Sequence, residues 1–361
     1  MPLKRIAYFV SPHGFGHAAR AAAVMESLSE IDSAVRFEIF TTVPSWFFQD
    51  SVSAPFNYHR LVTDIGLVQK NAFQSDLEDT LRALDGFFPP APSLIAEIAE
   101  TIRALNCVLV ICEIAPMGIL VAKEARIPSI LVENFTWDWI YQQYVVSDNR
   151  IKRHIDYLQP IFNAVDYHIQ TEPVCSRNSA DLVTTPVSRK IKTTGAEIRM
   201  RLGLPANGKM VLITTGGIPQ GYGFLETLKN LREITFVMPG AGPLLEMVDN
   251  LIILPHRSDY YHPDLVNAAD AVIGKVGYST LSEIYHGGVP FGYVARSNFR
   301  ESESMVEFIQ KQIPGIALSE SEFNTGSWTA KLADLLDLAP VKREIANGAD
   351  QISRFIEDLL P

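Results

Sequence analysis

Two histidines and two glycines occur together in the sequence SPHGFGHAAR, at residues 11–20. This stretch joins a predicted strand at 4–10 to a predicted helix at 18–30. Gly14 and Gly16 let the backbone turn tightly and approach a ligand closely, and a helix start offers N–H groups and partial positive charge. Because imidazole titrates near neutral pH, His17 is the first candidate for a general base and His13 is the second. The alternative is that both are hydrogen-bonded structural residues.

The glycines of this stretch do not match two common phosphate-binding motifs. The chain has no GxxxxGK[ST] sequence, which excludes a Walker P-loop. The dinucleotide pattern GxGxxG also fails, because Ala19 stands where the third glycine is required. The stretch therefore predicts a ligand site of another class.

A second glycine-bearing stretch, GKVGYSTLSE at residues 274–283, has the same strand-to-helix context. Gly277 permits close approach of a ligand, and Ser279 and Thr280 are predicted at the N-cap of the helix. A diphosphate fits such a helix start, and Lys275 would add positive charge.

Glu283 lies about one helical turn after Ser279 and can accept hydrogen bonds from ribose hydroxyls. The alternative is that Glu283 only forms a capping box with Ser279 or Thr280. Two further glycine-rich strand ends in this half, Gly216-Gly217 and the GAG sequence at 240–242, favour a nucleotide site.

Strand and helix signals alternate along both halves of the chain, which predicts βαβ units and parallel sheets. The segment 184–204 interrupts the series with prolines, basic residues and glycines, and there we place a boundary. The prediction is a doubly wound α/β domain at 1–190, a second at 191–340, and a helix at 341–361 that crosses back to the first domain. In such sheets, ligands bind beyond the carboxyl ends of the strands, at the topological switch point. The main strands are expected at 4–10, 37–42, 108–112, 129–133, 167–170, 210–215, 234–238, 251–254, 271–274 and 290–294.

The composition narrows the classes of function. With 361 residues, the chain is long enough for two domains of roughly 100–200 residues each. Its net charge of −10 argues against an extended nucleic-acid interface. Three cysteines without a CxxC pair predict neither a disulfide scaffold nor a zinc site. The first apolar run, at 6–10, is too short for a signal peptide, and the longest run, at 107–122, is too short to span a bilayer. We therefore expect a cytoplasmic protein, and peripheral contact with the inner membrane face is left open.

The two loops resemble those of GT-B glycosyltransferases. HGFGHAAR is similar to the Gly-His loop of that superfamily, which includes the lipid II-forming N-acetylglucosaminyltransferase and plant UDP-sugar transferases. AADAVIGKVGYSTLSEIYHGGVP is similar to their C-terminal donor motif. A more specific resemblance is to the glycosyltransferase-like N-terminal region of plant L-arabinokinases. It is carried by HGFGHAAR, DIGLVQKNAFQSDLEDT, ENFTWDWIYQQYV and GKVGYSTLSEIYHGGVPFGYVARSNFRESESM, in order along nearly the whole chain. The kinase half of that family has no counterpart here, so kinase activity is not expected.

The resemblance implies two facing Rossmann-like domains with a cleft between them, and it assigns roles to residues. His17 matches the general base of inverting relatives. The stretch around Asn298 departs from the lipid II enzyme, which has paired glutamines there, so the sugar stays open. The nucleotide and diphosphate set is Gly216, Gly217, His256, Arg257, Lys275, Gly277, Tyr278, Ser279, Thr280 and Glu283, and the donor-sugar set is Asn298, Arg300 and Glu301.

Aromatic residues crowd the end of the strand at 129–133, and sugars stack their C–H faces on aromatic rings. The alternative is a buried cluster that packs helices. The expected acceptor-side set is Gly14, Phe15, Gly16, Trp137, Asp138 and Trp139.

These features predict a glycosyltransferase that moves a sugar from a nucleoside diphosphate sugar, with a UDP-sugar favoured, to a hydroxyl of a small-molecule, glycan or lipid acceptor. We expect inversion, no metal ion and no cofactor beyond the co-substrate. The alternatives are a nonhydrolysing UDP-sugar epimerase and a non-catalytic sugar-nucleotide-binding protein.

Overall fold

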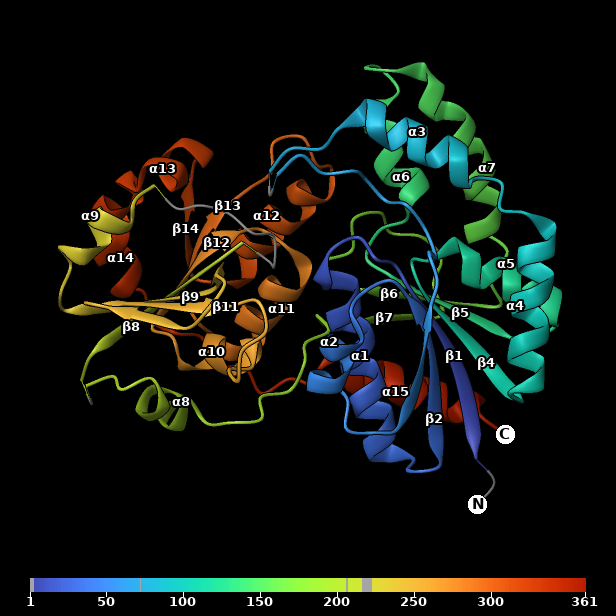
Figure 1. Cartoon of the computed structure of the whole chain (residues 1–361), viewed down its shortest axis with the longest axis horizontal. Coiled ribbons are helices and arrows are strands. Elements are labelled where there is room, and N and C mark those ends of the chain that lie inside the picture. The colour runs from blue at the N-terminus through green and yellow to red at the C-terminus, as the bar shows by residue number, and fades with distance from the viewer. Residues whose placement is uncertain (1–2, 72, 206, 216–222) are drawn as a thin grey trace. The chain divides into compact units, whose positions relative to one another are not determined.

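The computed structural model describes residues 3–71, 73–205, 207–215 and 223–361. The chain forms two compact units (Figure 1). Unit 1 comprises Met1–Gln69, Ser75–Arg189 and Ala346–Pro361, and unit 2 comprises Lys70–Gln74 and Lys190–Ile345.

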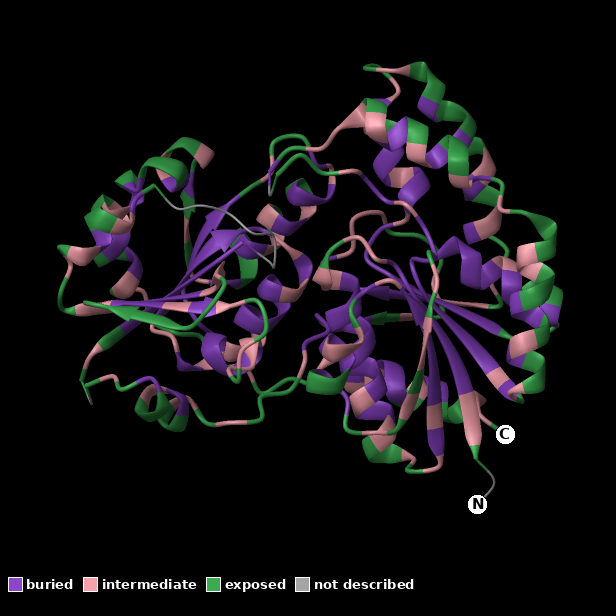
Figure 2. Ribbon diagram, viewed as in Figure 1, coloured by how far each residue is buried: buried purple, intermediate pink, exposed green. Residues whose placement is uncertain are grey.

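Unit 1 contains a seven-stranded sheet in the order β3-β2-β1-β4-β5-β6-β7, and all neighbouring strands are parallel. The near-continuous apolar sequences of β1 and β4 suit strands that are covered on both faces, and Figure 2 shows the central strands as buried. The strand order reverses between β1 and β4, which is therefore the switch point of this sheet. The strands are β1 Lys4–Val10, β2 Val35–Thr41, β3 Phe56–Arg60, β4 Cys107–Glu113, β5 Ser129–Glu133, β6 Tyr167–Thr171 and β7 Leu182–Thr184.

The helices of unit 1 flank this sheet. The prediction of a helix at 18–30 is wrong at its start, because α1 begins at Phe15 and places His17 in the first helical turn. Gly14 precedes it with φ of 73°, a conformation that glycine adopts without strain. The helices are α1 Phe15–Ile31, α2 Ser45–Ser51, α3 Leu77–Phe87, α4 Pro92–Ala104, α5 Pro116–Ala125, α6 Trp137–Tyr141, α7 Lys152–Phe162 and α15 Gly348–Leu359, with 3-10 turns η1 Gln142–Tyr144 and η2 Asn149–Ile151.

The last helix of the chain, α15, packs against α1 within unit 1. Ser353 donates to the carbonyl oxygen of Val24 at 3.2 Å, and Ser27 donates to Asp350 at 2.6 Å. The predicted helix at 341–361 starts too early, because Asn347 caps α15 by accepting from the backbone N–H of Ala349.

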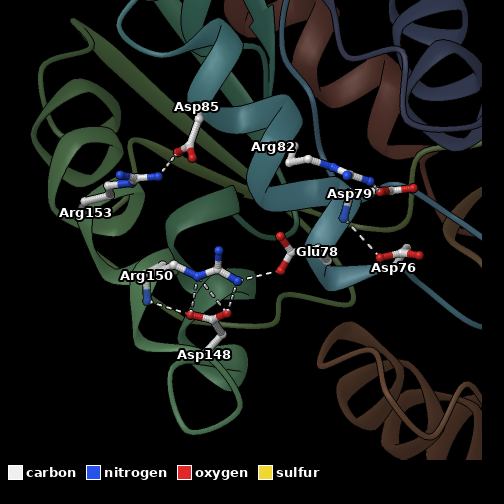
Figure 3. A network of polar contacts seen from close by, with 8 residues as sticks. All are labelled: Asp76, Glu78, Asp79, Arg82, Asp85, Asp148, Arg150 and Arg153. Atoms are coloured by element: carbon white, nitrogen blue, oxygen red, sulfur yellow. Dashed lines mark hydrogen bonds and ion pairs between the residues drawn. The ribbon is translucent and has the colours of Figure 1, made fainter.

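An exposed network of ion pairs joins α3 to η2 and α7 (Figure 3). Arg150 contacts Asp148 at 2.6 Å and Glu78 at 2.5 Å, and Arg153 contacts Asp85. Pairs this exposed are screened by water and salt, so the network adds little to the stability of the fold.

Unit 2 contains a second seven-stranded sheet, in the order β10-β11-β9-β8-β12-β13-β14. Its strands are parallel except for the short edge strand β10, which pairs antiparallel with β11. The order reverses between β8 and β12, which gives this sheet the same kind of switch point as unit 1. The strands are β8 Lys209–Thr214, β9 Ile234–Gly242, β10 Glu246–Val248, β11 Leu251–Pro255, β12 Ala271–Lys275, β13 Phe291–Val294 and β14 Gly315–Leu318.

The core of unit 2 forms between this sheet and the helices around it. Trp328, Phe236 and Phe224 are buried there, and Phe73 from the segment Lys70–Gln74 joins them by packing on Phe323. The helices are α8 Gly195–Arg201, α9 Leu225–Lys229, α10 His262–Ala268, α11 Tyr278–Gly287, α12 Glu301–Gln312, α13 Glu320–Thr325, η3 Ser327–Lys331 and α14 Leu332–Leu336.

Candidate functional site

In unit 1, His17 lies at the switch point of the sheet. The loop after β1 leads into the first turn of α1, where the ring of His17 faces Glu113, the last residue of the neighbouring strand β4. The distance from His17 Nδ1 to Glu113 Oε1 is 3.5 Å, and Nδ1 has no hydrogen-bond partner among the described residues. The ring also packs edge-on against Phe135 and Trp137. A titratable ring with about 7% of its side chain exposed therefore stands beside a buried carboxylate.

Arg20 connects Glu113 to two neighbouring strands. Its Nε donates to Glu113 at 2.5 Å, and its Nη1 donates to Asn134 at 2.8 Å and to Thr171 at 3.1 Å. All four side chains are buried. The network therefore links the carboxyl ends of β4, β5 and β6 to helix α1.

Burial sets the charge states of this network. Desolvation and the adjacent Arg20 hold the pKa of His17 well below 6.5, so its imidazole is neutral near pH 7 and can accept a proton. Burial raises the pKa of Glu113 to about 7, and the guanidinium of Arg20 opposes this rise.

A second buried carboxylate, Asp64, lies on the other side of Trp137. It accepts hydrogen bonds from Ser11 at 3.1 Å and from the indole N–H of Trp137 at 2.9 Å. Burial raises the pKa of Asp64 to about 7, while the hydrogen bonds from Ser11 and Trp137 lower it. Asp64 thus fixes the indole that packs against the ring of His17.

His13 packs edge-on against Trp137, with ring centroids 5.0 Å apart. Its Nδ1 accepts from the backbone N–H of Leu67 at 3.4 Å. Gly66, with φ of 63°, makes room for this pair, because a Cβ there would lie 2.8 Å from His13 and 2.9 Å from Trp137. Tyr141 donates to the carbonyl oxygen of Gly66 at 2.8 Å. These contacts favour the positioning of Trp137 as the role of His13.

The residues predicted for the acceptor side lie in different parts of unit 1 and do not form one site. Trp137 belongs to the buried network around Asp64, whereas Asp138 and Trp139 line a pocket elsewhere in unit 1. Phe15 stacks on Phe47, with ring centroids 4.9 Å apart. At Gly14 and Gly16, an added Cβ would meet nothing within 4 Å, so neither glycine is required by packing.

In unit 2, Lys275 ends β12 at the switch point and is buried. Desolvation and the positive charge of Arg296 lower its pKa to about 7, whereas Glu301 raises it. Arg296 pairs with Glu301 at 3.3 Å and lies over the ring of Phe299. Glu301, predicted to bind the donor sugar, is thus part of a buried charged cluster with two cations.

The helix α11 begins directly after this lysine. The prediction of Ser279 and Thr280 at its N-cap is wrong, because Gly277 is the N-cap and has no side chain that could cap the helix. The extended backbone of Gly277 lets the helix begin at Tyr278, two residues earlier than a Thr280 start. An added Cβ at Gly277 would meet nothing within 4 Å among the described residues, so their packing does not require glycine here.

Glu283 does not form the capping box that was its alternative role. Its Oε2 lies 2.6 Å from Nδ1 of His262, and Nε2 of that histidine lies 3.3 Å from the hydroxyl of Thr214. Thr214 ends β8, so this chain of side chains crosses the switch point from α11 to β8.

The other predicted donor residues either follow strands of unit 2, near the carboxyl ends of its sheet, or fall outside the described residues. His256 and Arg257 follow β11 and are exposed, and the ring of His256 lies close to Gly240. Asn298 is exposed, and Arg300 directly precedes α12. Gly216 and Gly217 fall outside the described residues.

The sequence interpretation missed several residues of the two networks. Arg20, Asp64 and Glu113 in unit 1, and His262 and Arg296 in unit 2, were not predicted as site residues. A signal existed for Glu113, a single carboxylate at the end of an apolar strand, and for Arg20 and Asp64, which fall in segments that carry the family resemblance.

Two kinds of feature are not found in the part of the chain that the structure describes. No helix there is both apolar enough and long enough to cross a lipid bilayer. No group of three or more His, Cys, Asp or Glu side chains there is arranged to hold a metal ion.

Two Rossmann-like units, each with its polar residues at a switch point, define the GT-B fold of glycosyltransferases, and comparisons with known proteins support this. UGT71G1 of Medicago truncatula, solved as a complex with UDP-glucose, aligns with a TM-score of 0.62 over 99% of this chain and 98% of its own at 12% identity. This likeness shows the fold alone. No family model matches the chain.

The sequence relatives agree with the predicted resemblance. The chain is 29% identical to L-arabinokinase of Arabidopsis thaliana in an alignment 363 positions long that covers 98% of this chain. It spans 34% of the length of that relative. It is also 22% identical to an uncharacterized glycosyltransferase, MK0977, of Methanopyrus kandleri, over 72% of this chain and 78% of the relative.

Proposed function

We propose that this protein is a glycosyltransferase that moves a sugar from a nucleoside diphosphate sugar to an acceptor hydroxyl. The observation that carries the proposal is the pair of switch-point sites. One offers a neutral, buried imidazole beside a carboxylate, and the other offers the start of a helix, with glycine at its N-cap, beside a buried lysine. The UDP-glucose complex of a protein with this fold supports a UDP-sugar as the donor.

Unit 1 supplies the base in this proposal. His17 takes the proton of the acceptor hydroxyl on Nε2, because Nδ1 faces Glu113. The resulting imidazolium is stabilised by the carboxylate of Glu113, which the bonds from Arg20 hold in place. The acceptor oxygen forms a bond to the anomeric carbon as the bond to the diphosphate breaks, and this direct displacement inverts the anomeric centre.

Unit 2 binds the donor in this proposal. The backbone N–H groups at the start of α11 and the ammonium of Lys275 stabilise the negative charge of the leaving diphosphate without a metal ion. Glu283 binds the ribose hydroxyls while His262 fixes its carboxylate. Residues Asn298 and Arg300 approach the sugar.

The test compares His17→Asn with His59→Asn, since His59 is a half-buried histidine of the same unit that pairs with Glu38. We expect H17N to lose transfer by about 100-fold or more, as for the removal of a general base, while H59N retains it. Binding of UDP, measured by the rise in melting temperature, should be equal in both. Turnover by H17N near the wild-type rate would remove His17 as the base.

A second measurement tests the class of reaction. The protein is incubated with UDP-N-acetylglucosamine, UDP-glucose or UDP-galactose, with and without an acceptor panel. We expect released UDP and a new glycoside only when an acceptor is present. Conversion of the donor sugar without any acceptor would favour an epimerase, and UDP-sugar binding without any reaction would favour a non-catalytic binding protein.

A further inference from the structure

A pocket of about 480 Å³ lies within unit 1, between α6, the end of α7 and strands β5 and β6. Its volume falls in the range of about 300–1,000 Å³ that is usual for small-molecule sites. Every residue that lines it belongs to unit 1. The pocket therefore exists within one unit.

Helix α6 separates this pocket from the network of His17. Trp137 and Tyr141 are four residues apart and share one face of the helix, which bonds to Asp64 and to the carbonyl oxygen of Gly66. Asp138 and Trp139 line the pocket instead. None of His17, Arg20, Asp64, Glu113 or Trp137 lines it, so the pocket is distinct from the proposed catalytic site.

Four side-chain amides contribute to the polar part of the lining, beside the hydroxyls of Thr136, Ser176 and Ser179. Gln142, Gln159, Asn163 and Asn178 come from three places in the sequence, since Gln159 and Asn163 lie one turn apart at the end of α7, and each amide offers both donors and acceptors. The half-buried indole of Trp139 adds an aromatic surface. Neighbouring hydroxyls of a sugar need donors and acceptors close together, and its C–H face packs on an aromatic ring, so this lining matches a saccharide.

Asp138 supplies a buried acceptor in this lining. Its side chain accepts from the hydroxyl of Thr136 and the backbone N–H of Trp139. Its Oδ1 is buried and has no hydrogen-bond partner among the described residues. A buried carboxylate oxygen without a partner is costly, and a ligand hydroxyl would satisfy it once the side chain of Asp138 turns toward the pocket, because Oδ1 has almost no accessible surface where it lies.

The charge of the lining excludes anionic ligands. Among the described residues that form it, none is Lys or Arg, Asp138 is the acidic one, and the ring of His168 is already paired with Glu133 at 2.8 Å. A phosphate or a diphosphate would face a carboxylate here without a compensating cation.

We infer that this pocket is a second binding site, that its ligand is an uncharged saccharide, and that it is separate from the site of donor binding and proton transfer. The ligand is either a free monosaccharide or one sugar unit of a larger glycan. The inference stands on the pocket alone and does not require that the proposed transferase activity be correct.

The test measures binding of uncharged sugars to the full chain by titration calorimetry and saturation-transfer NMR. Methyl β-D-glucopyranoside probes a single sugar ring, lactose probes a sugar unit within a glycan, and glucose 6-phosphate probes an anion. We expect one or both of the uncharged ligands to bind, and glucose 6-phosphate to bind more weakly. If methyl glucoside binds more tightly than lactose, the ligand of the pocket is a free monosaccharide. If lactose binds more tightly, the ligand is a sugar unit of a larger glycan.

A pair of double variants shows where binding occurs. Gln159→Ala/Asn163→Ala removes two exposed amides of the pocket, and Gln49→Ala/Asn149→Ala removes two exposed amides outside it. The first should weaken sugar binding by about tenfold or more, as expected for two lost hydrogen bonds, and the second should leave it unchanged.

Asp138→Asn, which keeps the size of the side chain, should also weaken sugar binding. The melting temperature and its rise with UDP verify that each variant is folded and that unit 2 is unaffected. Absence of binding by both uncharged sugars, equal affinity in the two double variants, or tighter binding of glucose 6-phosphate would overturn the inference. None of these results would bear on the transfer assay of H17N.

Discussion

Replacement of Lys275 by methionine should stabilise unit 2 and weaken its binding of UDP. Lys275 is 8% exposed, and its pKa is lowered from 10.5 to about 7, chiefly by burial. The difference of about 3.5 pKa units, at about 1.4 kcal/mol per unit, corresponds to ~5 kcal/mol of unfavourable free energy for the buried charge. Methionine has a similar length and no charge, so it removes this cost.

The gain in stability should depend on pH in a defined direction. The pKa of Lys275 is lower in the folded state than in the unfolded state, so between about pH 7 and 10.5 the unfolded chain holds the additional proton. Stability of the wild-type protein therefore rises with pH across this window, and below pH 7 the folded protein carries the full cost. The advantage of K275M should be largest at pH 6, at up to ~5 kcal/mol, and should shrink as the pH approaches 10.

Because a two-unit chain does not unfold in one defined transition, the measurement must report on unit 2 itself. Protein equilibrated in urea at pH 6 or pH 9.5 is given a short pulse of hydrogen exchange, and peptides that cover β12 and β13 are analysed by mass spectrometry. Lys311→Met is the matched control, because Lys311 is 71% exposed in its side chain and contacts Glu307 at 3.6 Å. It should change stability little at either pH.

The same substitution should weaken the binding of UDP, although it stabilises unit 2. The ammonium form of Lys275 attracts the diphosphate, so wild-type affinity should fall as the pH rises above about 7, and K275M should bind weakly at every pH. A K275M protein that is less stable than wild type at pH 6, or equally stabilised at pH 6 and pH 9.5, would refute the reasoning.

Three further predictions concern unit 1. The transfer rate should fall on the acid side with a midpoint below pH 6.5, because the pKa of His17 is lowered and its neutral form is the base; a pH–rate profile with a midpoint at or above 6.5 would contradict this. Gly66→Ala should destabilise unit 1 by about 2–4 kcal/mol, since it combines a left-handed backbone with a clash against His13 and Trp137. Gly86→Ala, in the helix α3 with open space around it, is its control and should be neutral or stabilising in urea unfolding. Arg20→Met should cost about 3–5 kcal/mol because it leaves Glu113 buried without its cation, whereas the exposed Arg82→Met should change little; equal melting temperatures for these two variants would argue against the buried pair.

Much of the fold follows from local sequence patterns. The bounds of β1 and β5 agree with the predicted strands at 4–10 and 129–133, because apolar runs flanked by turn residues are a local signal. Other boundaries required tertiary information. The edge strands β7, β10 and β14 were not predicted, since they are short and their pairing depends on neighbours distant in the sequence.

The two loops at the switch points were visible in the sequence for the same reason. Glycines and histidines between a strand and a helix form a local pattern, and the order of strands and helices predicts that such loops lie at one edge of a sheet. The sequence therefore determined where to look and which side chains were available, including His17 and Lys275.

The partners of those side chains were decided by the tertiary structure alone. Glu113 lies 96 positions after His17 in the sequence, and only the parallel pairing of β1 with β4 brings the two together. In the same way, β8 and β12 place Thr214 and His262 beside Glu283. Burial then set the pKa values of these groups, and burial is a property of the packed sheet and helices that no short stretch of sequence carries.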